Sequence, residues 1–200
     1  LKKFLEDVEL RLSQLEGGGA TGSGGDQGDG AQNDGMDEAA EDAVTSPRGE
    51  ALAEPDAAAS DDSLPEPEGA LPEGSPQQQY DYAQSQLRRG NYDAAERGFR
   101  AFVEQHPDTD LAGNAQYWLG ETYYARQKYA QAAQAFLTGF RDYGSSSKGA
   151  DSLLKLGLSL ANLGNTDRAC DTLNELSRAY PDAPDRIKRR ARQERARLGC

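Results

Sequence analysis

Few residues of this 200-residue chain have the types and spacing that catalysis requires. His106 is the only histidine, and no serine, cysteine or metal-ligand cluster accompanies it in the spacing of a catalytic triad or a metal site. We interpret it as structural. Most acidic side chains near one another lie in residues 17–76, where we expect nothing to hold carboxylates in a fixed geometry. The sequence therefore predicts no enzyme, no cofactor and no metal site.

The charge of the chain is distributed very unevenly. The formal net charge is −12, but residues 17–76 alone carry −14 and residues 77–200 carry +3. Residues 17–76 also lack Phe, Tyr and Trp and are rich in Gly, Pro and Ala. Such a composition cannot bury enough apolar surface to offset the entropy of ordering. We expect a disordered acidic linker that spans roughly 40–46 Å.

The first sixteen residues have a heptad pattern. Apolar side chains recur at spacings of four and three, which is typical of a coiled-coil seam: Leu1, Leu5, Val8, Leu12 and Leu15. One interpretation is that residues 1–16 end a longer oligomerising coiled coil, which would make the protein a homo-oligomer. The other is an amphipathic helix that packs on another surface or frays, because so short a helix is unstable alone.

No apolar run approaches the ~18 residues that a membrane span needs, so we expect no transmembrane segment. The chain begins with Leu1 rather than Met. We therefore expect a processed piece, from which any upstream signal peptide is missing.

From residue 77 onward the sequence repeats with a period of 37. Small residues recur at Ala95, Ala132 and Ala169, and large apolar residues recur at Phe99, Phe136 and Leu173. Two helical patterns per copy predict an all-α fold, an α-solenoid of three helix pairs plus a capping helix. The copies span about 77–107, 111–144 and 148–181, and the cap spans 185–198. Turn and stop residues place the helices at 77–89, 93–105, 111–126, 130–143, 148–163, 167–179 and 185–198.

The second copy resembles the tetratricopeptide repeat. Leu119, Gly120, Tyr123, Ala132 and Phe136 stand at positions of the family pattern. The chain departs from the pattern in its period of 37 rather than 34, and in a glutamine at the position of the pattern's tryptophan, with Trp118 two residues later. We interpret Trp118 as packing in the core or the groove wall.

The layout of coiled coil, low-complexity linker and three repeats is similar to the Tol-Pal-associated periplasmic family called CpoB or YbgF. The motif from Asn114 to Tyr123, NAQYWLGETY, carries this resemblance together with the stretches YDAAERGFRAFVEQHPDT and YAQAAQAF. The resemblance implies a non-catalytic periplasmic adaptor that binds TolA and a peptidoglycan synthase. It also implies a role in cell division and a trimeric N-terminal coiled coil.

The repeat register predicts which side chains line the concave face of the solenoid. In a tetratricopeptide stack the first helices of each pair form that face. Tyr, Asn and Gln there suit recognition of a protein segment. The predicted groove residues are Gln77, Tyr80, Gln84, Arg88, Asn114, Tyr117, Glu121, Tyr124, Asp151 and Asn162. Carboxylate-clamp repeats use a clamp of Lys and Asn, and Tyr80 and Gln84 occupy its first two positions here, so that mode of binding is weakly supported.

Two features of the C-terminal end remain open. Cys170 and Cys200 should lie at neighbouring ends of antiparallel helices, which favours a disulfide in an exported chain; the alternative is a buried Cys170 and a free Cys200 thiol. The basic last helix is a solvated cap or an electrostatic contact. No aromatic platform accompanies it, so we expect no nucleic-acid binding.

Other interpretations of the repeats are a generic interaction module, such as an outer-membrane-assembly lipoprotein-like adaptor or a cytosolic co-chaperone-like scaffold. The first needs a lipidated N-terminal cysteine, and no Cys precedes Cys170. The second needs the carboxylate clamp.

Overall fold

The structure, a computed structural model, describes residues 6, 8–10, 12 and 71–200. Every regular element among residues 71–200 is an α-helix, and each begins and ends within one residue of its expected position. The helices are α2 (Pro76–Arg88), α3 (Tyr92–Gln105), α4 (Ala112–Ala125), α5 (Tyr129–Tyr143), α6 (Gly149–Asn162), α7 (Thr166–Ala179) and α8 (Asp185–Leu198).

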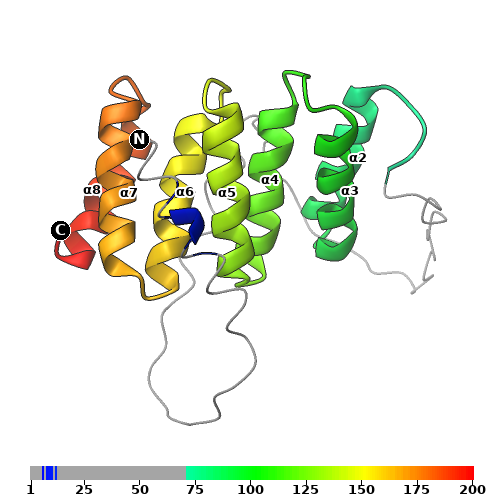
Figure 1. Ribbon diagram of the computed structural model, residues 1–200. Helices are drawn as coiled ribbons and strands as arrows, with labels where there is room; N and C mark the ends of the chain where they lie inside the picture. Colours follow the sequence, from blue (N-terminus) through cyan, green and yellow to red (C-terminus); the bar gives the residue numbers. More distant parts are fainter. Residues whose placement is uncertain (1–5, 7, 11, 13–70) are drawn as a thin grey trace, which may run out of the picture. The chain divides into compact units, whose positions relative to one another are not determined.

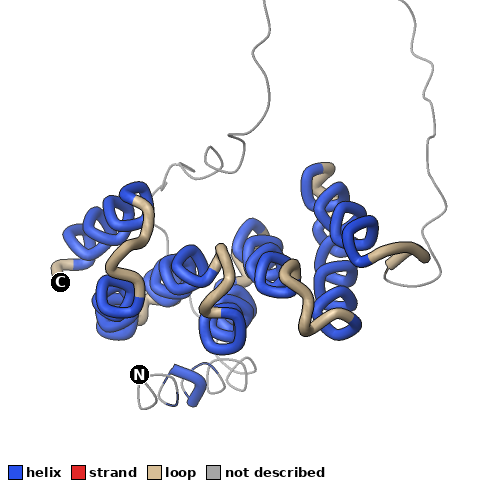
Figure 2. The backbone as a smooth tube through the Cα atoms, turned by 90° about the horizontal axis from the view of Figure 1, so that it is seen from above, coloured by secondary structure: helices blue, strands red, loops and turns tan. Residues whose placement is uncertain are grey.

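The helices stand side by side in chain order, from α2 to α8 (Figure 1). Each helix packs on the next one along the chain, and α4 also contacts both α2 and α6. The first helices of successive pairs therefore touch one another, which is the arrangement of an α-solenoid. Figure 2 shows the same stack from above, with helices joined by short loops.

Helix α2 begins one residue before its expected start, inside the range that the sequence assigned to the linker. Ser75 and Gln78 form a capping box, in which the Ser75 hydroxyl accepts from the Gln78 N–H and the Gln78 side chain accepts from the Ser75 N–H. Pro76 then occupies the first helical position, where its missing N–H costs nothing. Residues 13–70, which hold the rest of the expected linker, lie outside the described residues, as do Leu1, Leu5 and Leu15 of the heptad seam.

The core is built from the repeated small and large positions. Phe99, Phe136 and Leu173 are fully buried. Phe136 and Leu173 lie against glycines of the first helices, Gly120 and Gly157 respectively. A Cβ on Gly120 would lie 2.5 Å from a ring carbon of Phe136. The small residues therefore set how closely the two helices of a pair approach.

The turn inside each pair requires a left-handed backbone at one repeat position. Gly90 and Gly164 have φ of 77° and 74°, and Gln127, the equivalent residue of the second pair, has φ of 57°. Glycine adopts this region without steric cost, whereas a residue with a Cβ is strained there.

We expect Gln127→Gly to raise the free energy of unfolding by about 0.5–1 kcal/mol, because it removes this strain. The reverse change in the third pair, Gly164→Gln, should lower it by a similar amount. Urea unfolding of both variants checks the pair of predictions. Shifts of the same sign would contradict this account of the turn.

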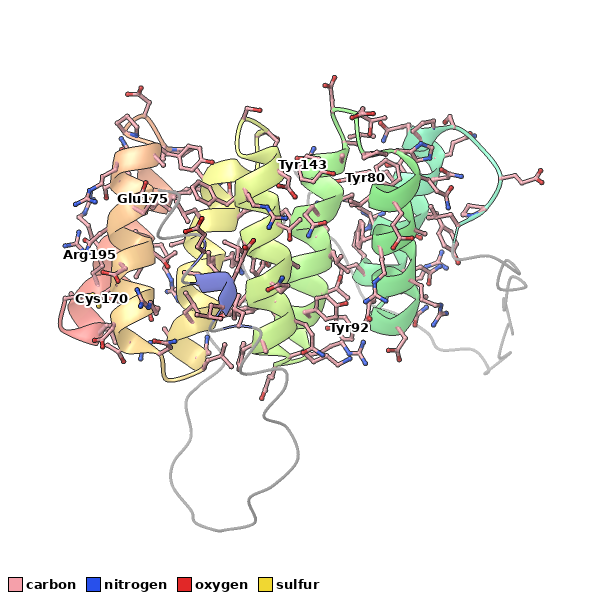
Figure 3. All side chains as sticks on the ribbon, in the orientation of Figure 1. Tyr80, Tyr92, Tyr143, Cys170, Glu175 and Arg195 are labelled. Atoms are coloured by element: carbon pink, nitrogen blue, oxygen red, sulfur yellow. A yellow bond between two sulfur atoms is a disulfide. The ribbon has the colours of Figure 1, made fainter. Side chains whose placement is uncertain are left out.

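The last helix closes the solenoid. Ile187 and Ala191 of α8 are buried, and α8 packs on both α6 and α7. Cys170 on α7 and Cys200 beyond α8 form a disulfide, with their Cα atoms 5.9 Å apart (Figure 3). The far end of α8 is therefore covalently joined to the last repeat.

Candidate functional site: the surface of the first helices

All ten groove residues expected from the sequence lie on α2, α4 and α6, the first helices of the three pairs. The repeat explains the placement, since positions 77, 114 and 151 are equivalent, as are 80 and 117. Among them, Gln77, Arg88 and Asn162 are exposed, while Gln84, Asn114, Glu121 and Tyr124 are half-buried.

Tyr80 and Tyr117, which the sequence predicts to line the concave face, are largely buried side chains. Each is only 7% exposed. The Tyr80 ring packs edge-on against Phe99 and Phe102, and the Tyr117 ring packs against Phe136. Burial raises the pKa of both phenols. These tyrosines form the floor of the surface, and replacing them with alanine would damage the core.

An aromatic and cationic cluster lies on α4 and at the start of α6. Trp118 is half-buried and its ring contacts Tyr117, with ring centroids 5.3 Å apart. The Lys148 ammonium lies 5.0 Å from the Tyr117 ring centroid and 5.7 Å from that of Trp118. A cation over aromatic faces at this range is attracted by the ring quadrupole.

A second cluster joins α4 to α6. Lys155 pairs with Glu121 at 2.9 Å and lies 4.7 Å from the Tyr124 ring centroid. The Asn162 amide donates to the Tyr124 hydroxyl at 2.9 Å. Burial raises the pKa of Glu121, although the Lys155 charge acts in the opposite direction. The carboxylate is therefore desolvated but partnered on one oxygen only.

The two ends of the surface are polar. On α2, Gln84 donates to the Tyr80 hydroxyl and accepts from Arg88. At the other end, Asp151 is 7% exposed and pairs with Arg186 of α8 at 3.0 Å. The basic last helix thus contributes at least one cation to the same surface.

Two lysines of this surface, Lys148 and Lys155, are not among the groove residues predicted from the sequence. The signal for Lys155 was present in the repeat. Asp81 and Trp118 directly follow the predicted groove residues Tyr80 and Tyr117, and Lys155 is the equivalent residue 37 positions after Trp118. Lys148 precedes α6 and does not occupy a repeat position that predicts a groove residue. Its proximity to the rings of Tyr117 and Trp118 is apparent only in the folded structure.

His106 has a structural environment. Its Nε2 lies 2.6 Å from the Gln79 Oε1, and its ring packs on Phe102. Within residues 71–200 and the few described near the N-terminus, no cluster of His, Cys, Asp or Glu could hold a metal ion. In the same residues no helix is long and apolar enough to cross a membrane. The first-helix surface combines aromatic rings, side-chain amides and lysine cations, as the contacts of Trp118, Asn162 and Lys148 illustrate.

Comparison with known proteins agrees with this architecture. Sequence models of the tetratricopeptide repeat match residues 80–144 and 151–183. Two curated proteins named cell division coordinator CpoB are similar, one from Pseudomonas putida strain KT2440 and one from Pseudomonas putida. Each is 38% identical over 63 residues, which are 30% of this chain and 24% of the relative. The chain thus spans about a quarter of the length of the curated relatives it matches, and the comparisons support a tetratricopeptide-repeat protein that is similar to CpoB.

Proposed function

We propose that this protein is a non-catalytic periplasmic adaptor of the Tol-Pal type. In this role its solenoid binds envelope proteins, TolA and a peptidoglycan synthase, and so coordinates peptidoglycan synthesis with outer-membrane constriction during division. Similarity to proteins named cell division coordinator supports the cellular role. The disulfide between Cys170 and Cys200 supports an oxidising compartment.

The observation that carries the binding role is the surface of first helices centred on Trp118. It combines an aromatic side chain with two lysines, Lys148 and Lys155, that lie over ring faces. Half-buried rings supply contact area at low entropic cost, and the amide of Asn162 holds the Tyr124 hydroxyl in place. A segment of a partner laid across α4 and α6 would cover these groups.

Linked copies would strengthen this binding. If the N-terminal segments oligomerise, several solenoids share one tether, and the effective concentration at a multivalent partner rises. An adaptor of this kind needs no active site, only a binding surface and a tether that links its copies.

The test is the affinity for purified TolA of the same organism, measured by calorimetry. We expect Lys148→Met to weaken binding about threefold to thirtyfold, because the cation over Trp118 and Tyr117 is lost while the stem is kept. Lys128→Met is the matched control, because Lys128 lies 6.0 Å from the Tyr123 ring and beside Glu96, away from the predicted groove.

Equal effects of the two substitutions would contradict the assignment of the first-helix surface. Binding of a different envelope protein but not of TolA or the synthase would leave a tetratricopeptide-repeat adaptor outside the Tol-Pal system. Both variants should keep the helicity and unfolding midpoint of the unmodified chain.

A further inference from the structure

A face of α5 differs from the equivalent faces of the other second helices. Positions one turn apart on this face hold Ala133, Leu137 and Arg141 in the second pair. The equivalent residues are Glu96, Arg100 and Glu104 in the first pair and Cys170, Asn174 and Arg178 in the third. Only the second pair therefore has apolar side chains at the first two positions.

The neighbouring helix shows the same difference. In the first pair, Arg100 is about half exposed and bonds to the Tyr123 hydroxyl on α4. The equivalents one repeat later are Leu137 on α5 and Leu160 on α6, which are 1% and 2% exposed. The side chains at the edge of the α3–α4 contact are therefore polar, whereas the equivalent side chains at the α5–α6 contact are apolar and buried. We call Ala133, Leu137 and Leu160 the apolar stripe.

The N-terminal segment has the side chains that would cover it. Residues 6, 8–10 and 12 are helical, and Val8 and Leu12 are each 1% exposed. They belong to the same buried apolar cluster as Leu137 and Leu160. Glu9 forms an ion pair with Arg141, one turn beyond Leu137 on the same face of α5. Leu10, which the heptad seam does not use, is 59% exposed.

We propose that the helical segment of residues 6, 8–10 and 12 docks within its own chain on the apolar stripe of the second repeat. Val8 and Leu12 make the apolar contacts, and the ion pair between Glu9 and Arg141 fixes the register. The 58 residues between positions 12 and 71 are enough to permit this, because a polypeptide can reach up to about 3.3–3.6 Å per residue. The opposite charges of Glu9 and Arg141, and the apolar side chains of Val8 and Leu12, favour the N-terminal segment as the occupant of the stripe.

Docking has a consequence for assembly. Val8 and Leu12 are the middle positions of the heptad seam, and a side chain buried on α5 cannot also face a second coiled-coil strand. The docked and oligomerised states of the segment are therefore mutually exclusive. Assembly through the seam requires its release from the second repeat.

Hydrogen exchange of the full chain tests the proposal, with Leu137→Arg as the variant. Arginine is the residue that the first repeat holds at this position, so α5 should tolerate it. We expect amide protection in residues 6–12 to fall about tenfold or more when the leucine contact is lost. Protection in α2–α4 should not change. Leu10→Ala is the control on the segment and should leave protection within about twofold.

A charge exchange supplies a second test that does not depend on Leu137. Arg141→Glu should raise exchange in residues 6–12 by about twofold to fivefold, and adding Glu9→Arg should restore it. Exchange that is the same in the unmodified chain, Leu137→Arg and Arg141→Glu would overturn the proposal. So would protection that disappears on dilution together with a dimer seen by sedimentation, because the stripe would then join two copies.

Discussion

Replacing Gly120 with valine is expected to lower the free energy of unfolding by about 3 kcal/mol. A Cβ at this position would lie 2.5 Å from the Phe136 ring. That ring is fully buried and packed on Tyr117, so it has no free space to enter. Helix propensity alone predicts a small gain in stability when a helical glycine is replaced. A large loss of stability would therefore come from packing against Phe136.

Ala125→Val, at the exposed end of the same helix, is the matched control. It should change stability by less than about 0.7 kcal/mol, the propensity difference between the two residues. Adding Phe136→Leu to Gly120→Val should recover part of the loss, because leucine fills the equivalent position in the third repeat. Urea denaturation followed by circular dichroism measures all three variants. A loss at Gly120 no larger than the loss at Ala125 would contradict the close approach of α4 and α5.

Removing the disulfide is expected to have the second large effect. In the loop-entropy model, a bridge that closes the segment from Cys170 to Cys200 stabilises the fold by about 3–4 kcal/mol. Helix α8 has few buried side chains besides Ile187 and Ala191. Its attachment should therefore depend strongly on this covalent link.

The measurement compares the unmodified chain with the Cys170→Ala, Cys200→Ala double variant, with and without a reducing agent. The reductant should lower the unfolding midpoint of the unmodified chain to that of the variant and leave the variant unchanged. Hydrogen exchange in α8 should increase while α3 keeps its protection. If the variant matches the oxidised chain in stability, the bridge contributes nothing to the native state.

The period of 37 made most of the fold predictable. Because equivalent positions recur, a copy with clear turn and stop residues defines the helix boundaries of the others. The resemblance of the second copy to the tetratricopeptide repeat then predicted how the helices stack. The start of α2 was missed by one residue, because the capping box of Ser75 and Gln78 and the proline between them lie in a stretch whose composition resembles the linker.

The surface was predicted less completely. The position of a residue in the repeat predicts which face of the helix it lies on, but not how deeply its side chain is buried. Tyr80 and Tyr117 lie on the expected helices yet pack inward on phenylalanines of α3 and α5. Lys148 precedes its helix and reaches the rings of α4 only through the fold. The ion pair between Glu9 and Arg141 joins residues 132 positions apart, which no local pattern indicates.

The central claim is that the first-helix surface binds a protein segment, and Trp118 offers a direct test because it is the only tryptophan in the chain. Its indole N–H gives a single resonance in a proton–nitrogen spectrum of the labelled protein. We predict that unlabelled TolA shifts or broadens this resonance in proportion to the binding measured by calorimetry, and that Lys148→Met weakens both responses together. Binding by calorimetry that leaves the indole resonance unchanged would contradict the claim and place the partner on another surface.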